Sequence, residues 1–394
     1  MEPEKPVRAL ENEGPLAGDL MQPNQEPQGS EYQTAVVAPG AKDLRWVFLG
    51  PHGLRAGWSL ALFIALLSLA LIAFAGIANA LFGPFIHAGS RTGTIDPVSS
   101  TLEKAVEVLS LLSAVFVMAR IERRRVADYY LRSARPITNF LAGACVGFLT
   151  LSVLVGSMAL GGWMHFGAVA LSGRRILLYG AVWAVGFLLV ACSEEGIFRC
   201  YLQYTLTRGI NFWWALGVNA LICIELLLRA KGNALWGVYL IALLGLPPCL
   251  ILHVNKTPRS GFWQAAWVTS ALFGFVHTGN NGENWIGIFA AGAIGFVFCV
   301  SVYVTGSAWW AIGCHASWDW AETYFYGTAD SGLIARGHLL TATPSGNPLW
   351  SGGTDGPEGS VLVLGVILLL LLAVLALYGR RRTSVAAAAQ QPAS

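Results

Sequence analysis

Charged residues are scarce in this chain of 394 residues, at 12% of the total, whereas soluble proteins usually carry about 25%. Hydrophobic residues make up 55% of the chain, and apolar runs of about 20 residues recur from residue 57 onward. The deficit of charge argues against a soluble protein. It predicts an all-α, polytopic transmembrane helix bundle of about 8–10 spans, with a buried polar active site among the helices.

Other features are absent as well. No basic tract is interleaved with aromatic residues in a soluble segment, so we expect no nucleic-acid partner. The seven cysteines form no C-x-x-C pair and all lie in apolar runs, which predicts small buried hydrophobic side chains rather than disulfides or zinc ligands. The first apolar run begins too far from Met1 for a cleavable signal peptide, so we expect none.

Composition divides the chain into segments. Residues 1–55 are polar, rich in Pro, Gly, Glu and Gln, and without apolar periodicity, so we expect a disordered cytoplasmic segment. The remainder is predicted to form N-terminal spans with an arginine-rich loop (56–137), a core (138–326) that contains a hairpin (211–254), an outer loop (327–359), and a last span with a polar tail (360–394).

The apolar runs and the arginines together predict a topology. Six arginines lie between residues 120 and 135, and three follow the last span. Because positive residues are enriched in cytoplasmic loops, and an even number of spans leaves both ends on one side, both termini are predicted to be cytoplasmic in an integral, multi-pass membrane protein. We expect ten spans, at residues 57–82, 101–119, 139–160, 176–206, 211–228, 234–254, 262–277, 285–305, 308–326 and 361–378.

Three ionisable residues interrupt the fourth span. Ionisable groups at membrane depth are unfavourable unless they are paired or face a polar cavity, so such residues indicate a functional site. Glu195 and Arg199 are four residues apart, which on a helix predicts a structural ion pair. Glu194 is turned about 100° away from Glu195 and is left to face something else.

Two further spans carry polar residues at helical spacing. Phe273 and His277 end the seventh span, and His315 and Asp319 lie in the ninth. Counted along helices from the predicted inner ends of their spans, Glu194, His277 and His315 have overlapping depths. One shared polar cluster satisfies these groups better than three separate ones, so we expect them to meet. Glu225 and Glu322 have no partner that the sequence identifies, and we expect both to lie at the lipid interface or to be protonated.

In this order and on separate spans, the patterns E-E-x-x-x-R, F-x-x-x-H and H-x-x-x-[N or D] resemble the motifs of the CPBP family. This family comprises the CAAX prenyl endopeptidases and the bacteriocin-processing or immunity membrane proteins also called Abi proteins. The matching residues are Glu194, Glu195 and Arg199, Phe273 and His277, and His315 and Asp319. The resemblance covers about residues 123–326 and implies that residues 138–326 form a catalytic core.

The chain departs from the family pattern in two places. Cys200 stands where the family usually has glycine after the Phe-Arg pair. About 70 residues separate Arg199 from Phe273, where the family usually has a short link and one helix. The hairpin at residues 211–254 therefore resembles an insertion, and its two spans leave the topology of the core unchanged.

The resemblance implies an intramembrane endopeptidase, which needs a water, a base and groups that stabilise an oxyanion. We expect Glu194 to be the general base, and His277 to hold the same water and pass the proton to the leaving amine. His315 and Asp319 are expected to face the carbonyl oxygen. Asp319 can donate a hydrogen bond only if it is protonated, and otherwise it orients His315.

A metal is the rival chemistry. His277, His315 and Glu194 would suffice as ligands for catalytic zinc with water in the fourth position, but the H-E-x-x-H pattern of most zinc peptidases is absent. We expect no cofactor, and zinc stays open as the alternative. The expected substrate is a peptide or a lipidated protein reached within the bilayer. A non-catalytic immunity or scaffold protein and a transporter are the other functions that the sequence leaves open.

Overall fold

The computed structural model describes residues 45–50, 53–89, 94–229, 246–247, 249–256, 260–280 and 282–388. Most of the expected disordered segment and most of the predicted sixth span, at residues 234–254, lie outside these ranges. The second half of the predicted hairpin insertion is therefore described only in part. The described chain is built almost entirely of helices, and the predicted all-α polytopic bundle is confirmed.

Long helices alternate with short connecting turns. The α-helices are α1 (Arg45–Phe48), α2 (Ala56–Gly89), α3 (Pro97–Ile121), α4 (Pro136–Leu160), α5 (Arg174–Glu195), α6 (Gln203–Gly209), α7 (Phe212–Arg229), α9 (Ser260–His277), α10 (Trp285–Thr305), α11 (Trp309–Asp319), α12 (Pro348–Ser351) and α13 (Leu362–Ala388). Two π-helices, η2 (Gly196–Leu202) and η4 (Trp320–Tyr326), continue α5 and α11. Two short 3₁₀ turns are η1 (Val126–Asp128) and η5 (Pro357–Gly359).

Six helical segments within the described residues are long and apolar enough to cross a membrane. They begin at Ala56, Pro136, Arg174, Phe212, Trp285 and Leu362. The predicted spans at residues 101–119, 262–277 and 308–326 are also helical, as α3, α9, and α11 with η4. Two of them, α9 and α11, carry residues of the predicted polar cluster, namely His277, His315 and Asp319.

Local signals at helix ends account for several boundaries. The side chain of Asp96 accepts hydrogen bonds from the backbone of Val98 and Ser99 and caps α3, which begins at Pro97. Asn284 caps α10 in the same way. Gly306 ends α10 in a left-handed conformation, with φ of 77°, which glycine adopts without steric strain.

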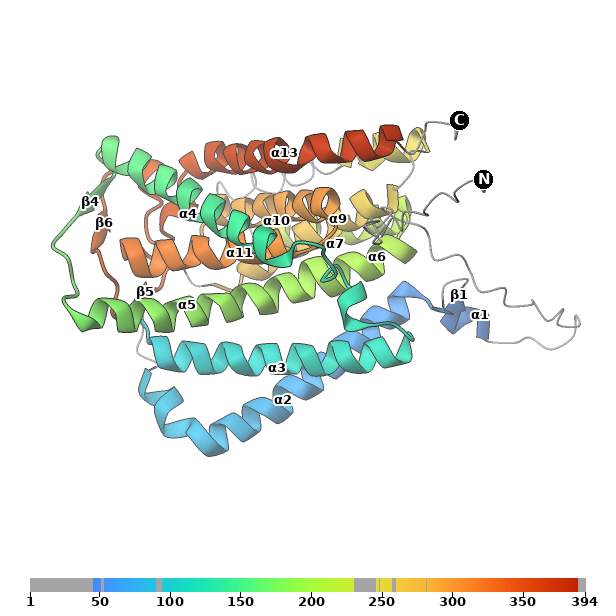
Figure 1. Ribbon diagram of the computed structural model, residues 1–394, viewed down its shortest axis with the longest axis horizontal. Coiled ribbons are helices and arrows are strands. Elements are labelled where there is room, and N and C mark those ends of the chain that lie inside the picture. Colours follow the sequence, from blue (N-terminus) through green and yellow to red (C-terminus); the bar gives the residue numbers. More distant parts are fainter. Residues whose placement is uncertain are drawn as a thin grey trace, which may run out of the picture. The chain divides into compact units, whose positions relative to one another are not determined.

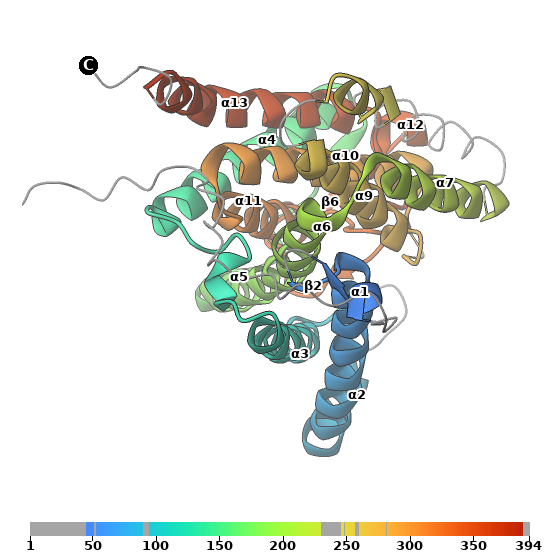
Figure 2. The ribbon, with the colours of Figure 1, turned by 90° about the vertical axis from the view of Figure 1, so that its right-hand side faces the viewer.

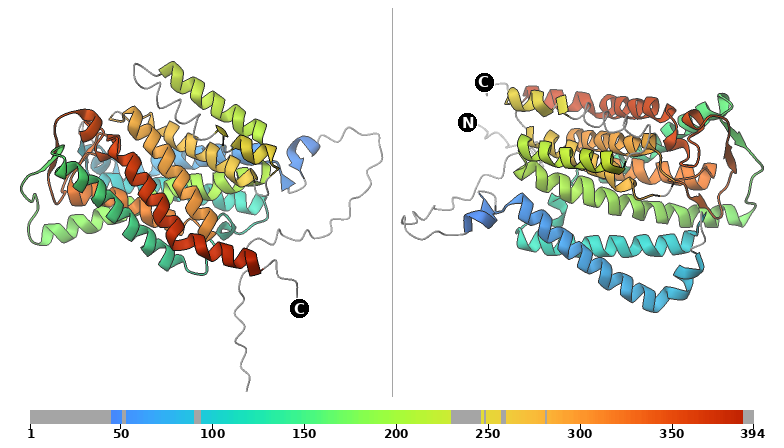
Figure 3. Two further views of the ribbon diagram at one scale, coloured as in Figure 1. Left: turned by 90° about the horizontal axis from the view of Figure 1, so that it is seen from above. Right: turned by 180° about the vertical axis from the view of Figure 1, so that it is seen from behind.

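Helix α11 lies in the middle of the bundle. It packs against α4, α5 and α10, as the view along the long axis shows (Figure 2). Helix α13 lies beside α4 and α10 (Figure 3). Helix α10 is the most enclosed candidate span, with 67% of its apolar window buried, whereas α2 has only 6% buried and leans away from α3 (Figure 1). The exposed apolar surface of α2 is consistent with contact with lipid.

Glycines bring α4 and α11 into backbone contact. A Cβ atom added at Gly143 would lie 2.1 Å from the carbonyl oxygen of Trp310, and one added at Gly147 would lie 2.3 Å from that of Cys314. From the other side, a Cβ at Gly313 would lie 2.1 Å from the carbonyl oxygen of Phe140. Small residues allow helices to approach this closely in membranes, where apolar surfaces alone do not drive association. The contact fixes α11, which carries His315.

The connecting segments form two ends of the bundle. At the loop end, defined by residues 327–359, β3 (Thr94–Ile95) pairs in parallel with β5 (Ile334–Ala335), and β4 (Met164–Phe166) pairs antiparallel with β6 (Ala342–Pro344). A further hairpin joins β1 (Leu49–Gly50) to β2 (Gly53–Leu54) before α2. At the arginine end, defined by residues 120–135, Arg124 donates a hydrogen bond to the hydroxyl of Tyr204 in α6 at 2.5 Å.

Candidate active site

Both helices that carry the motif carboxylates change their winding at those residues. Helix α5 ends at Glu195 and continues as the π-helix η2, and α11 ends at Asp319 and continues as the π-helix η4. The π-helix is rare and occurs frequently at functional sites. The sequence signals of an ordinary helix did not distinguish these two turns.

His315 lies among three carboxylates. Its Nδ1 atom is 2.8 Å from Oε1 of Glu195. Its Nε2 atom is 3.4 Å from Oδ2 of Asp319 and 3.8 Å from Oε2 of Glu194. Because Glu195 accepts a hydrogen bond from Nδ1, the Nε2 atom is the one presented to Glu194 and Asp319. Residues from α5 and α11, about 120 positions apart in the chain, therefore meet around one imidazole.

The pair of Glu195 and Arg199 lies in the buried floor of this cluster. Oε2 of Glu195 and Nε of Arg199 are 3.2 Å apart, and neither side chain is exposed. None of the guanidinium nitrogens of Arg199 makes a hydrogen bond within the described part of the chain. The guanidinium instead lies 4.2 Å from the centre of the Phe273 ring, in a cation–π contact. Glu195 thus joins Arg199 to His315, and its position is set by both.

His277 is the last residue of α9, and its own helix orients it. Its Nδ1 atom is 2.7 Å from the carbonyl oxygen of Phe273. A carbonyl oxygen only accepts, so Nδ1 carries the proton and Nε2 is left as an acceptor. The Phe273 ring packs against both imidazoles, with ring centres 4.8 Å from His277 and 6.2 Å from His315.

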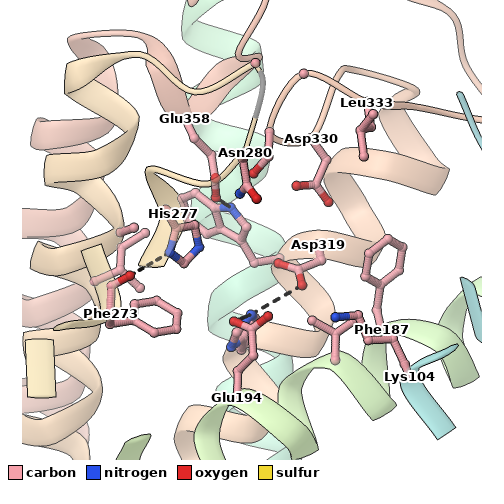
Figure 4. A pocket seen from close by; sticks show the side chains of 18 of the residues that line it. Lys104, Phe187, Glu194, Phe273, His277, Asn280, Asp319, Asp330, Leu333 and Glu358 are labelled. Atoms are coloured by element: carbon pink, nitrogen blue, oxygen red, sulfur yellow. Dashed lines mark hydrogen bonds and ion pairs between the residues drawn. The ribbon is translucent and has the colours of Figure 1, made fainter. Parts of the chain in front are cut away.

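The motif residues line one cavity of about 450 Å³. Glu194, His277, His315 and Asp319 all contribute to its wall, and Phe273 contributes its ring. Figure 4 shows His277 and Asp319 on opposite sides of this space, with Glu194 below them. The cavity is lined by residues of α3, α5, α9, α10, α11 and the loop at residues 327–359, so it exists only in the folded bundle.

Several other charged or polar residues line the cavity that the sequence patterns did not identify. Lys104 lies in α3 and donates to both carboxylate oxygens of Glu107, at 2.9 and 3.0 Å. Asn280, Asp330 and Glu358 lie at the loop end of the cavity (Figure 4). Lys104 is one of the charged residues at the start of the second predicted span, at residues 101–119, and this charge inside an apolar run could have identified it. No motif marks Asp330 or Glu358, because the outer loop reaches the cavity only through tertiary folding.

The two outer-loop carboxyls are held by hydrogen bonds and surrounded by other acids. Oδ2 of Asp330 accepts from the hydroxyl of Thr323 at 2.9 Å, and Oε1 of Glu358 accepts from the indole of Trp318 at 2.6 Å. Burial, followed by repulsion from Asp319, raises the pKa of Asp330 to about 7. Burial and repulsion from Asp330 likewise raise the pKa of Glu358 well above its usual range.

Two glutamates outside the motifs, Glu225 and Glu322, were expected to lie at the lipid interface or to be protonated, with no partner that the sequence identifies. Glu225 has a partner, because Arg229 lies one helical turn further along α7 with Nη2 2.7 Å from its carboxylate. Glu322 is not at a lipid interface: its side chain is buried in η4, near Asp330 and Glu358. The seven cysteines are all free, and four of them are buried.

The described residues do not fit the zinc alternative in this arrangement. No group of three or more histidine, cysteine or acidic side chains within the described ranges is disposed to hold a metal ion.

Comparison with known proteins agrees with the motif reading. No curated protein and no solved structure matches the chain. A family model matches a segment that includes the second and third motifs, Phe273 with His277 and His315 with Asp319, and that does not include Glu194. It supports, at the level of the family, a CAAX-type peptidase embedded in the membrane. The model of the Rce1-like type II CAAX prenyl endopeptidases matches residues 249–321, which confirms the resemblance of this chain to the CAAX protease family.

Proposed function

We propose that this protein is an intramembrane endopeptidase in which Glu194 activates a water molecule for attack on a peptide bond. The observation that carries the proposal is the convergence of Glu194 and Asp319 on His315 in the lining of a cavity that His277 also lines. A base, two imidazoles and enclosed space for a substrate are the parts that hydrolysis within a bilayer needs.

In the proposed reaction, the Glu194 carboxylate takes a proton from the water molecule while the oxygen of that water attacks the carbonyl carbon of the substrate. In the proposed reaction His315 carries a proton on both ring nitrogens: Nδ1–H donates to Glu195, and Nε2–H stabilises the negative charge that forms on the carbonyl oxygen. The C–N bond then breaks, and the proton held by Glu194 passes to the amine. His277, with Nε2 free to accept, holds the water during attack and assists this transfer.

Asp319 and Glu195 act on His315 rather than on the substrate. Glu195 accepts from Nδ1 and keeps the ring in one orientation. Asp319 lies 3.4 Å from Nε2, which supports the role of orienting this atom over that of donating to the oxyanion. The expected substrates are peptides or lipidated proteins that approach within the bilayer, because the cavity lies among helices.

The direct test is cleavage of a library of unmodified and prenylated peptides by the purified protein in detergent. Glu194→Gln keeps the size of the side chain and removes the base, so we expect turnover to fall by at least about 10³-fold, within the range of general base catalysis and charge stabilisation together. Glu225→Gln is the matched control, since Glu225 undergoes the same change in an exposed pair outside the cavity.

The assay is repeated with a chelator to separate the two mechanisms. Turnover that persists in the chelator and disappears in Glu194→Gln supports the glutamate mechanism. A folded Glu194→Gln protein that cleaves as fast as the parent would remove the proposal. Loss of turnover in the chelator, restored by added zinc, would replace it with the metal version.

A further inference from the structure

A second cavity lies at the arginine end, between the start of α2 and the end of α6. It has a volume of about 170 Å³ and is lined by Arg55, Ser59, Thr205, Arg208 and the glycines of the β1–β2 hairpin and of the α6 terminus. It shares no lining residue with the candidate active site. Its volume is several times the ~30 Å³ that one water molecule occupies in the liquid.

The charge of this wall has one sign. Arg55 and Arg208 line the cavity, and no acidic residue lines it within the described part of the chain. The guanidinium of Arg55 is oriented by a hydrogen bond from Nε to the backbone oxygen of Trp46, at 2.8 Å. Arginine presents a planar set of N–H donors that suits phosphate oxygens, and two arginines at one small cavity favour an anion over a neutral ligand.

Backbone donors lie beside the same space. The first turn of α2, a helix of 34 residues, begins at the cavity with Ala56. Its first N–H groups have no partner within the helix and carry partial positive charge.

We propose that this cavity binds a phosphate group, supplied either by the headgroup of an anionic lipid or by free phosphate. The cavity lies at the end of the bundle that the arginine-rich loop marks, since Arg124 of that loop contacts Tyr204 in α6. A membrane surface would therefore present phosphate groups at this depth. The proposal does not depend on the peptidase reaction.

Binding would strengthen one contact between helices. A Cβ atom added at Gly209 would lie 2.4 Å from Cβ of Ala56, so the end of α6 already touches the start of α2. A phosphate that bridges Arg55 and Arg208 joins these two ends. Helix α6 continues η2 and α5, so the ligand stabilises the arrangement of the same long segment that carries Glu194.

The test uses the full chain purified in a detergent without phosphate. Inorganic phosphate and short-chain phosphatidylglycerol are added in separate titrations, and the midpoint of thermal unfolding is followed. We expect a saturable rise of the midpoint with at least one of them. Arg208→Gln and Arg55→Gln should each raise the half-saturating concentration by about tenfold, because each removes a charge-assisted contact. Arg132→Gln, which removes an exposed arginine of the arginine-rich loop, should change it less than twofold.

Each result decides the proposal or the source of the phosphate. A rise with inorganic phosphate identifies a site for the free ion, and a rise with the lipid alone identifies a headgroup site. No saturable rise with either, or equal weakening in Arg132→Gln, would overturn the proposal. If Arg208→Gln does not yield folded protein, Arg55→Gln provides the same test, since the Arg55 side chain is exposed.

Discussion

The buried pair of Glu195 and Arg199 predicts an unequal response to the loss of either charge. Both side chains are fully buried, and leaving one partner of a buried pair uncompensated costs about 3–5 kcal/mol. Glu195→Gln leaves the Arg199 cation with aromatic rings alone, the nearest being that of Phe273, and such a cation–π contact is worth about 0.5–2 kcal/mol. We expect this substitution to lower the free energy of unfolding by about 3–5 kcal/mol.

Arg199→Met leaves a charge that still has a partner. Nδ1 of His315 stays within 2.8 Å of Glu195, so the remaining carboxylate keeps a charge-assisted hydrogen bond of about 1.5–3 kcal/mol. The methionine also fills part of the apolar space between Phe198, Phe273 and Phe298 that the guanidinium now occupies. The cost of Arg199→Met should therefore be about 1–3 kcal/mol, below that of Glu195→Gln.

The measurement is reversible unfolding of the parent, both single variants and the double variant in one detergent. The double variant leaves neither charge unpaired. Its loss in free energy of unfolding should therefore be smaller than the sum of the two single losses, by about 1–3 kcal/mol. Equal losses in the two single variants, with strict additivity, would show that the ion pair does not stabilise the bundle in the way its geometry indicates.

Three further predictions concern packing, pH and an exposed ion pair. Gly313→Ala places a methyl group against the backbone of α4 and should destabilise the protein by about 1–3 kcal/mol, whereas Gly156→Ala, with open space around its Cβ, should be neutral or slightly stabilising; thermal unfolding of both checks this. Folding raises the pKa of Asp330 from its ordinary value of 3.8 to about 7, so ionisation of this carboxyl opposes folding as the pH rises through that interval. Asp330→Asn should therefore raise the unfolding midpoint at pH 8 and leave it unchanged near pH 3.5. Equal effects at both pH values would contradict this. Removing Arg229 from its exposed pair with Glu225, as Arg229→Gln, should change stability by no more than about 0.5 kcal/mol, and a larger loss in the same assay would show that the pair is not solvated.

The sequence alone was sufficient for features that depend on one helix. Runs of apolar residues predicted the helical spans, and i,i+4 spacing predicted the pair of Glu195 and Arg199, because residues four apart share a helical face. Contacts between the connecting segments, through β3–β5 and β4–β6, were not part of the prediction. The cytoplasmic position of the termini stays a prediction.

Only the tertiary structure decided which groups meet across helices. The spacing of His315 and Asp319 does not show that Glu195 binds Nδ1 of that imidazole, since this contact depends on how α11 packs against α5. Neither Asp330 nor Glu358 lies in a span, yet folding of the outer loop places both at the cavity. Periodicity specifies the face of a helix, whereas the partner of that face depends on close packing such as the glycine contact of α4 and α11.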